Sequence, residues 1–164
     1  MVSDPMVIRT ATTEDVSLIL AFIQELAEYE KLSHAVVATE ASLRRELFGE
    51  RPAAEVLIAE VDGAAAGFAL FFHNFSTFLS RRGIYLEDLY VRPAFRRLGI
   101  GRALLTRLAG IAVERDCGRL EWSVLDWNQS AWRFYESLGA TPMDEWTTFR
   151  LTGDALIALG RPRP

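Results

Sequence analysis

The sequence predicts a single mixed α/β domain in which helices flank a mostly antiparallel central sheet. Three observations carry this prediction. The chain has 164 residues, the size of one full domain and short for two. Half of the residues are hydrophobic and 24% are charged, which is typical of a globular protein and not of a disordered one. Apolar residues recur at helical spacing early and late in the chain, and in short strand-like runs between.

The first half of the chain is expected to form a strand, two helices and a hairpin. Its first helix begins with a pattern like a capping box, because Thr12 lies three residues before Asp15. Asp62 and Gly63 separate two apolar runs, a spacing typical of a tight hairpin turn. In chain order, the elements are strand 7–10, helix 13–30, helix 39–48, strand 55–61 and strand 67–72.

The second half alternates strands and helices, which places one strand–loop–helix–strand unit inside the sheet. After a loop ending at Gly83, Pro93 ends the next strand, and Gly139 ends the last long helix. The elements are strand 84–91, helix 99–115, strand 119–125, helix 128–138, strand 146–151, which closes the sheet, and a short helix after Gly153. We therefore expect one domain over residues 1–164, with a core over 6–152 and a flexible tail over 160–164.

Composition and charge argue against several classes of protein. The formal net charge is −4, so the chain lacks the basic excess that binds the phosphates of nucleic acids. The single cysteine, Cys117, excludes an internal disulfide and a cysteine metal cluster, and the two histidines, His34 and His73, argue against a histidine metal site. No apolar run approaches the roughly 20 residues of a membrane span, and the start lacks the pattern of a signal peptide. We expect a cytoplasmic protein that uses no metal, nucleic acid or membrane.

The loop before the helix 99–115 carries the clearest functional signal. Its two glycines let a ligand approach the backbone closely, and the first turn of a helix attracts phosphate through unsatisfied N–H groups. Its arginines add positive charge at the same point, so the loop suits a pyrophosphate. These residues are Arg96, Arg97, Gly99, Gly101 and Arg102. The alternative is a plain helix entrance with solvated arginines.

Two other nucleotide motifs do not fit this loop. A dinucleotide fingerprint needs a third small residue where this chain has Leu104. A Walker loop needs a lysine, and the only lysine, Lys31, is far away. The pattern that remains, RRLGIG at residues 96–101, resembles the Gln/Arg-x-x-Gly-x-Gly/Ala acetyl-coenzyme A motif of the GCN5-related N-acetyltransferases, the GNAT superfamily.

The resemblance extends over residues 8–151 and favours one branch of the superfamily. Tyr-Leu-Glu-Asp at 85–88, Asp-Trp-Asn at 126–128 and Phe-Tyr at 134–135 look like the diamine acetyltransferases of the spermidine/spermine or thialysine type. This implies the GNAT fold, one N-acetyltransferase domain, acetyl-CoA as co-substrate and a homodimer. The sequence departs from the pattern at Arg97, where relatives often carry Gly. It also departs in the loop 75–82, where relatives tend to place a Trp, and this leaves the acceptor open.

Acetyl transfer to an amine needs a base for the amine and an acid for the departing thiolate, because aliphatic amines have a pKa near ~10.4 and are protonated at neutral pH. The resemblance assigns Glu87 to substrate binding and makes it a candidate base acting through water. It also places Tyr135 near the sulfur as the general acid. From the residues alone, Glu87 could be an exposed strand carboxylate, and Tyr135 could be a core aromatic.

The resemblance also assigns two sets of binding residues. The main chain of residues 89–91 is expected to pair with the pantetheine arm, and the backbone N–H groups of 97–102 to bind the pyrophosphate. The cofactor set is Leu89, Tyr90, Val91, Arg96, Arg97, Leu98, Gly99, Ile100, Gly101, Arg102, Asn128, Ser130, Ala131 and Tyr135. Asn128 can also serve simply as a helix N-cap. The acceptor set is Tyr29, Glu30, Glu87, Asp88, Glu121, Trp122, Ser123 and Glu145, whose acidic and aromatic side chains would attract a cation.

We therefore expect an acetyl-CoA-dependent N-acetyltransferase that acts, by direct attack in a ternary complex, on a primary amine of a small cationic acceptor. Such an acceptor would be a polyamine, a diamine or a thialysine-like amino acid. One alternative is a GNAT enzyme for peptide N-termini or an aminoglycoside-like drug, and another is a non-catalytic CoA-binding regulatory module. Cys117 is not expected to be a nucleophile, because no histidine lies near it in the sequence.

Overall fold

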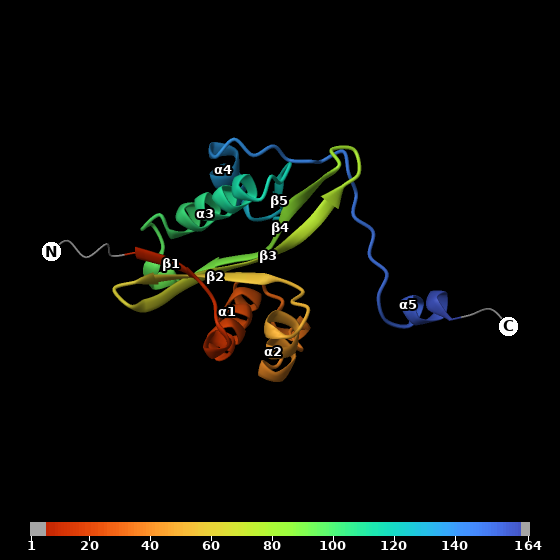
Figure 1. Cartoon of the computed structure of the whole chain (residues 1–164), viewed down its shortest axis with the longest axis horizontal. Coiled ribbons are helices and arrows are strands. Elements are labelled where there is room, and N and C mark those ends of the chain that lie inside the picture. Colours follow the sequence, from red (N-terminus) through yellow and green to blue (C-terminus); the bar gives the residue numbers. More distant parts are fainter. Residues whose placement is uncertain (1–5, 162–164) are drawn as a thin grey trace. The chain divides into compact units, whose positions relative to one another are not determined.

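The structure is a computed structural model that describes residues 6–161 (Figure 1). The chain divides into two compact units, Met1–Ser123 and Val124–Pro164, which are described separately. The last three residues of the expected tail over 160–164 lie outside the described residues. Within the described residues, no helix combines the length and the apolar composition needed to cross a membrane.

The N-terminal unit is built on a five-stranded sheet with the strand order β1-β2-β3-β4-β5. Neighbouring strands from β1 to β4 pair antiparallel, and β5 alone pairs parallel, with β4. The strands are β1 (Met6–Thr10), β2 (Glu55–Val61), β3 (Ala64–Ser76), β4 (Arg81–Val91) and β5 (Leu120–Trp122). The mostly antiparallel mixed α/β fold is therefore confirmed, including the β2–β3 hairpin, whose turn residue Gly63 has a φ of +77°.

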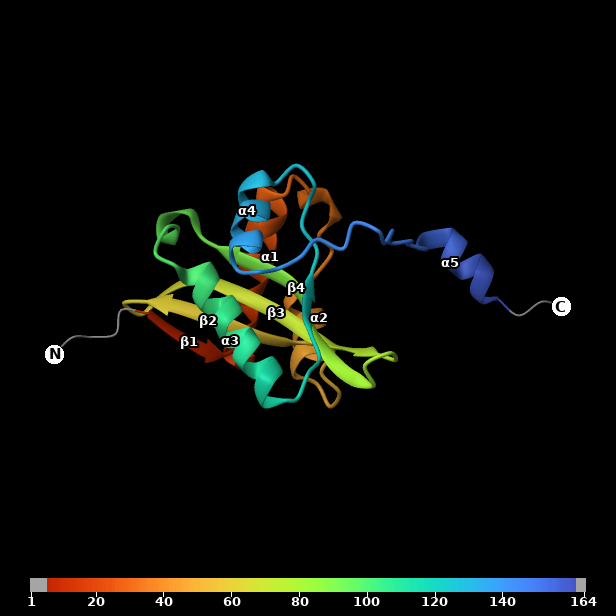
Figure 2. The ribbon, with the colours of Figure 1, turned by 90° about the horizontal axis from the view of Figure 1, so that it is seen from above.

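Helices cover both faces of this sheet. In Figures 1 and 2, α1 and α2 lie against one face and α3 lies along the other. The α-helices of this unit are α1 (Val16–Tyr29), α2 (Glu40–Phe48) and α3 (Ile100–Glu114), with short 3-10 turns at Thr13–Asp15, Ser33–Ala35 and Pro93–Phe95. The two layers bury apolar side chains on each side of the strands, which fixes α3 against the sheet.

The starts of α1 and α2 follow from local chemistry. The Asp15 carboxylate accepts a hydrogen bond from the Thr12 backbone N–H (2.7 Å) and two from the Arg9 guanidinium (both 2.8 Å), which hold the pKa of Asp15 below its usual value. The Thr39 hydroxyl accepts from the Ser42 backbone N–H (3.1 Å). The capping box expected at Thr12 and Asp15 is thus confirmed.

The core places α1 directly on the sheet. Phe22 of α1 and Phe68 of β3 are fully buried, and their rings stack with centroids 5.1 Å apart. On the other face, Leu104 and Leu108 of α3 are also fully buried. Because both helices are anchored in this way, the C-terminal end of α1 and the N-terminal end of α3 are fixed relative to β4.

The C-terminal unit contains α4 (Gln129–Ser137) and α5 (Gly153–Gly160). The Asn128 side chain caps α4 by accepting from the Ala131 backbone N–H (3.4 Å), as expected of an N-cap, and Gly139 follows the helix with a φ of +88°. A helix after Gly153 is also confirmed. None of the described side chains from residue 124 onward is fully buried.

The expected strand over 146–151 is wrong in this structure. These residues are among those that the structure describes, and they form no strand. The Trp146 and Phe149 side chains are 77% and 93% exposed. Its aromatic and β-branched residues favour a strand locally, but a strand also needs a neighbouring strand to take its backbone hydrogen bonds. The strand expected over 119–125 is shortened to β5 for the same reason, because its pairing with β4 ends at Leu86 and Trp122.

Candidate active site

A bulge in β4 exposes the first candidate catalytic group. Leu86 pairs with Phe71 and Asp88 pairs with Leu70, so Glu87 is the extra residue between two pairs. Bulges of this kind redirect side chains and bend the strand. The Glu87 side chain is accordingly exposed to solvent. The structure places this carboxylate at the surface, where an acceptor can reach it.

Beyond the bulge, one edge of β4 is open. The pairing with β5 ends at Leu86, whereas β4 continues to Val91. Within the described residues, no strand covers the edge formed by residues 87–91 on that side. The backbone N–H and C=O groups on such an edge can hydrogen-bond an extended ligand that carries amides. This edge includes Leu89, Tyr90 and Val91 of the expected cofactor set.

Three carboxyl groups share this region. Burial, together with the charges of Glu87 and Glu30, raises the pKa of Asp88 to about 6. Burial also raises the pKa of Glu30, which directly follows α1. Because the charges of Glu87 and Glu30 disfavour the ionised form of Asp88, a cation beside these carboxylates would relieve the repulsion. The structure thus brings together Glu30, Glu87 and Asp88, with Tyr29 beside Glu30 in the chain.

The acceptor residues on β5 are held by their neighbours. Glu121 lies opposite Tyr85 in the register and forms an ion pair with Arg119 (2.9 Å), so its negative charge is already balanced. The Ser123 hydroxyl lies 2.8 Å from the Tyr85 hydroxyl. Trp122 pairs with Leu86, one residue before the bulge. The register thus places Glu121 and Trp122 on the strand beside β4, and the Arg119 guanidinium compensates the charge of Glu121.

The loop before α3 has the features of an anion site. Gly99 is the N-cap of α3 in a left-handed conformation, with φ 78° and ψ 12°. No side chain caps this helix among the described residues, and its first turn contains no acid. Its first N–H groups are therefore left for a ligand, and the helix dipole adds positive potential there. Ile100 is buried and anchors the turn.

Arg97, where the sequence departs from the family pattern, adopts a left-handed backbone conformation. Its φ is +68°, in the left-handed region that favours glycine. A residue with a side chain costs roughly 1–2 kcal/mol in this conformation. The chain accepts this strain, and Arg97 keeps a positive charge beside the uncapped helix.

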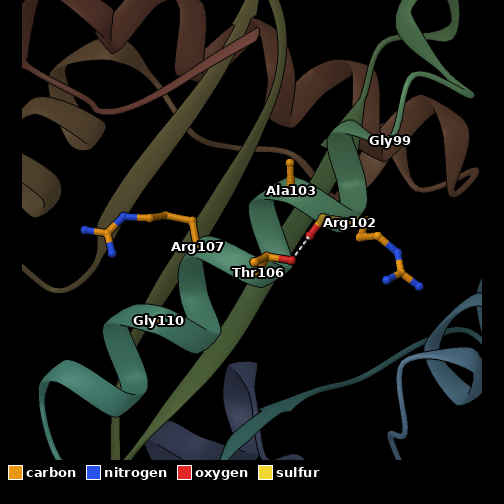
Figure 3. Close-up of a pocket in the computed structure, with 6 residues that line it drawn as sticks. All are labelled: Gly99, Arg102, Ala103, Thr106, Arg107 and Gly110. Atoms are coloured by element: carbon orange, nitrogen blue, oxygen red, sulfur yellow. Dashed lines mark hydrogen bonds between the residues drawn. The ribbon is translucent and has the colours of Figure 1, made fainter.

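A depression runs along the outer face of α3 from the same point (Figure 3). It has a volume of about 480 Å³. The lining residues are Gly99, Arg102, Ala103, Thr106, Arg107 and Gly110. In Figure 3 the Arg102 and Arg107 side chains extend on opposite sides of the helix, and the Thr106 hydroxyl donates to the Arg102 carbonyl (2.8 Å). The small residues leave room beside the first turn of α3 for a bulky ligand.

Arg96 makes contacts that sequence reasoning did not anticipate. Its Nε donates to the Val91 carbonyl (3.0 Å), and its guanidinium lies over the Tyr29 ring at 5.0 Å and near the Tyr90 ring at 5.9 Å. This side chain therefore joins the anion loop, residues 96–99 before α3, to β4 and to the end of α1. In the sequence, Arg96 is notable only as the first residue of the Arg-x-x-Gly-x-Gly motif. That motif predicts a contact with phosphate and gives no sign of the contacts with Val91, Tyr29 and Tyr90.

Glu25 and Arg92 are two further residues that sequence reasoning missed. The Glu25 carboxylate of α1 accepts from Nη2 of Arg92 (2.9 Å) and from its Nε (3.0 Å). Arg92 also donates to the Ala65 carbonyl (3.0 Å) and lies 4.7 Å from the Phe22 ring centre. This ion pair ties α1 to the end of β4. No sequence signal links the two residues, because they are 67 positions apart.

The remaining expected site residues belong to the C-terminal unit. Ser130 and Ala131 lie in the first turn of α4 and both hydrogen-bond the Asn128 side chain, at 3.3 and 3.4 Å. Tyr135 lies one turn later, and its ring is 5.4 Å from that of Phe134. Glu145 follows α4 in the segment without regular structure. The structure thus gathers Asn128, Ser130, Ala131 and Tyr135 at the N-cap and in the first two turns of α4.

Cys117 lies at the other end of α3 from the anion loop. Its sulfur is 3.9 Å from Nδ1 of His73, so the fold supplies a histidine neighbour that the sequence did not indicate. His73 is engaged elsewhere, with its Nδ1 3.0 Å from the Gly83 carbonyl and its Nε2 2.9 Å from Arg115. The 15 residues of α3 span about 22 Å. Cys117 is therefore remote from the Gly99 loop.

Comparison with known proteins points to one family. The family model of the acetyltransferase (GNAT) family matches residues 21–140. The chain is 40% identical to the thialysine N-epsilon-acetyltransferase of Bos taurus, with 94% of this chain and 96% of that protein covered. It is 37% identical to the L-ornithine N5-acetyltransferase of Arabidopsis thaliana, with 94% and 87% covered.

A solved structure shows the same fold. An integron cassette protein from the mobile metagenome of V. cholerae superposes with a TM-score of 0.82 at 28% sequence identity, covering 98% of this chain and all of that one. The family match spans most of the chain, and the relatives named above align over nearly their whole length. The chain therefore belongs to the GNAT family of acetyltransferases, in the branch of the diamine and thialysine N-acetyltransferases.

Proposed function

We propose that this enzyme transfers the acetyl group of acetyl-CoA directly to a primary amine of a small cationic acceptor, such as a diamine, a polyamine or a lysine-like amino acid. The observation that carries this proposal is the group of three carboxyls, Glu30, Glu87 and Asp88, beside the open edge of β4. A small polycation suits such a site, because it neutralises several carboxylates at once. The relatives named for thialysine and L-ornithine support the same acceptor class.

The anion loop and the strand edge would hold the co-substrate. The uncapped first turn of α3, with Arg97 and Arg102 beside it, would bind the pyrophosphate through backbone N–H groups and charge. The edge of β4 from Leu89 to Val91 would pair with the amides of the pantetheine arm. The family resemblance assigns Ser130 and Ala131, at the start of α4, to the same co-substrate.

Two side chains would move protons in the reaction. Glu87 would take a proton from the protonated acceptor amine, directly or through a water molecule, so that the nitrogen can attack the thioester carbon. The new C–N bond forms as the C–S bond breaks, and the nitrogen loses its second proton to solvent as the neutral amide forms. Tyr135 would protonate the departing thiolate and regain its own proton from solvent. Once Glu87 has passed its proton to solvent, one proton is released overall. Positioned proton transfers of this kind each contribute roughly 10²–10⁴-fold to a rate.

We also propose a cytoplasmic homodimer. The family resemblance supports the dimer, and a single cysteine suits a reducing compartment. Native mass spectrometry of the full chain tests the dimer, because it would yield twice the 18.4 kDa mass of one chain.

A thiol-release assay with acetyl-CoA tests the reaction itself. The acceptors would be small polycationic amines, peptides with free N-termini, and aminoglycosides. We expect the small polycations to be the best acceptors. Faster turnover of peptides or aminoglycosides would contradict the acceptor class, and binding of acetyl-CoA without turnover of any amine would contradict the enzyme proposal.

A further inference from the structure

The Arg96 side chain contacts both the end of β4 and the end of α1. Its Nε donates to the carbonyl of Val91 (3.0 Å), which is the last residue of β4. Its guanidinium lies 5.0 Å from the centre of the Tyr29 ring, and Tyr29 is the last residue of α1. The residue itself sits in the loop that leads to Gly99. Three parts of the site thus meet at this guanidinium.

One side of this contact is rigid. The Tyr90 ring, 5.9 Å from the guanidinium, is only 7% exposed and packs edge-on against Phe22. Burial and the nearby Glu25 carboxylate raise the pKa of Tyr90, so the hydroxyl stays protonated. Glu25 is held in turn by Arg92. On the β4 side, Arg96 therefore contacts a buried and well-held ring.

The other side of the contact is more exposed to solvent. Tyr29 is 40% exposed and stands where α1 ends. The next residue, Glu30, is one of the three carboxyls proposed to attract the acceptor. A shift of Arg96 would therefore change the setting of Tyr29 and Glu30, while the buried Tyr90 side stays in place.

We propose that Arg96 is a positioning residue that couples the binding of the two substrates. It acts through the Tyr29 ring and the Val91 carbonyl, and a direct contact with phosphate is not its main role. This inference rests on the proposed function. Binding of the pyrophosphate at Gly99 would fix the loop and its Arg96, and Arg96 would then fix Tyr29 and Glu30 for the acceptor. Coupling of this kind is reciprocal, so the acceptor must also tighten the binding of coenzyme A.

The shape of the guanidinium separates this role from a phosphate contact. Arginine stacks its plane on aromatic rings and can donate from Nε at the same time. Lysine keeps the positive charge and binds phosphate as a point charge, but it lacks the planar guanidinium and the Nε donor through which Arg96 makes its two contacts. The Arg96→Lys variant therefore removes the proposed coupling while it keeps most of the attraction for phosphate.

The experiment measures the dissociation constant of coenzyme A by calorimetry, without and with a saturating amine that the enzyme acetylates. Coenzyme A carries no acetyl group, so the ternary complex cannot react. The variants are Arg96→Lys, Tyr29→Phe, which keeps the ring, and Tyr29→Leu, which removes it. The control is Arg44→Lys, a change at an exposed arginine on α2.

We expect the amine to tighten coenzyme A binding about 5–10-fold in the unmodified enzyme, in Tyr29→Phe and in the control. In Arg96→Lys and Tyr29→Leu this factor should fall below about 2-fold. Coenzyme A binding without amine should change less than about 3-fold in Arg96→Lys. In steady-state assays, the acceptor KM of this variant should rise about 5-fold while kcat stays within about 2-fold.

Three results would overturn the coupling role. They are no coupling in the unmodified enzyme, full coupling in Arg96→Lys, or a loss of coenzyme A affinity of about 10-fold or more in that variant without amine. The last result would make Arg96 a plain phosphate ligand. A failure of the proposed function looks different, because the unmodified enzyme would then acetylate no amine at all.

Discussion

Asp88 and Glu87 are adjacent carboxyl groups at the bulge of β4, and burial together with the charge of Glu87 raises the pKa of Asp88 to about 6. The unfolded chain has an ordinary Asp pKa of 3.8. A carboxyl whose pKa is raised by folding stabilises the protein below its unfolded pKa, and this stabilisation is lost as the pH rises through the folded pKa. The charged form of Asp88 therefore lowers the stability of the folded protein at neutral pH, and a bound cation would offset this cost.

Asp88→Asn should stabilise the enzyme at pH 8 by about 1–3 kcal/mol, because the variant has no buried charge there. At about pH 4 or below, where native Asp88 is protonated, the gain should largely disappear. Denaturant unfolding at the two pH values measures the difference, with Glu50→Gln, an exposed acid, as the control. Equal gains at both pH values would contradict the assignment of the raised pKa to Asp88.

The same titration predicts a pH effect on substrate binding. As the pH rises through about 6, Asp88 gains its charge, so the KM for a cationic acceptor should fall. This fall should be absent in Asp88→Asn. Steady-state kinetics over this pH range, at saturating acetyl-CoA, provides the measurement.

Gly99→Val should weaken acetyl-CoA binding severely, because a β-branched side chain would stand where the ligand meets the backbone. Gly99 has a φ of +78°, a conformation that a residue with a side chain adopts only with strain. Nothing lies within 4 Å of where its Cβ would be, so the change causes no clash at the Cβ. Gly63→Val is a matched control, since Gly63 has φ +77°, equally open space and a position in the β2–β3 turn. Both variants should lose roughly 1–2 kcal/mol of stability.

Calorimetry with acetyl-CoA then separates strain from ligand contact. Only the Gly99 variant should lose affinity, whereas both should show lower unfolding midpoints. An unaltered affinity in Gly99→Val would remove the loop from the cofactor site.

Tyr135→Phe keeps the ring that packs beside Phe134 and removes only the hydroxyl. If Tyr135 protonates the departing thiolate, the rate of the chemical step should fall by roughly 10²–10⁴-fold. The control is Tyr85→Phe, which removes a hydroxyl that lies 2.8 Å from the Ser123 hydroxyl, and its rate should fall by less than about 3-fold. Single-turnover measurements isolate the chemical step. A Tyr135→Phe rate like that of the unmodified enzyme would exclude this tyrosine as the acid.

Cys117→Ala should keep most of its turnover, since the thiol lies past the C-terminal end of α3 and its neighbour His73 is held by Gly83 and Arg115. Mass spectrometry of enzyme quenched during turnover checks the same point. An acetyl group on Cys117 would favour a two-step transfer through the protein and contradict direct attack.

Local signals in the sequence predict much of this fold. Thr12, Thr39 and Asn128 each begin a helical segment as N-caps, and β2 has the expected bounds, Glu55–Val61. These features depend on residues within a few positions of one another. The strand expected over 146–151 failed because its local pattern says nothing about a pairing partner.

Short motifs in the sequence mark part of the candidate site. Glu87, Asp88 and the loop before Gly99 belong to motifs of a few adjacent residues, which can be recognised without knowing the fold. The contact of Arg96 with Tyr29 joins positions 67 residues apart, and the Glu25–Arg92 ion pair spans the same separation. The pKa of Asp88 depends on burial, which no local pattern specifies. Such features follow only from tertiary packing.

The central claim is acetyl transfer to a small cation with Glu87 as base, and kinetics of Glu87→Gln with the best polycationic amine tests it most directly. The variant keeps the shape of the side chain and removes both the base and a negative charge. We predict a higher acceptor KM, a lower kcat, a pH profile shifted upward and an unchanged affinity for acetyl-CoA. Unchanged acceptor kinetics in Glu87→Gln, or an amine panel led by neutral or anionic acceptors, would contradict the account.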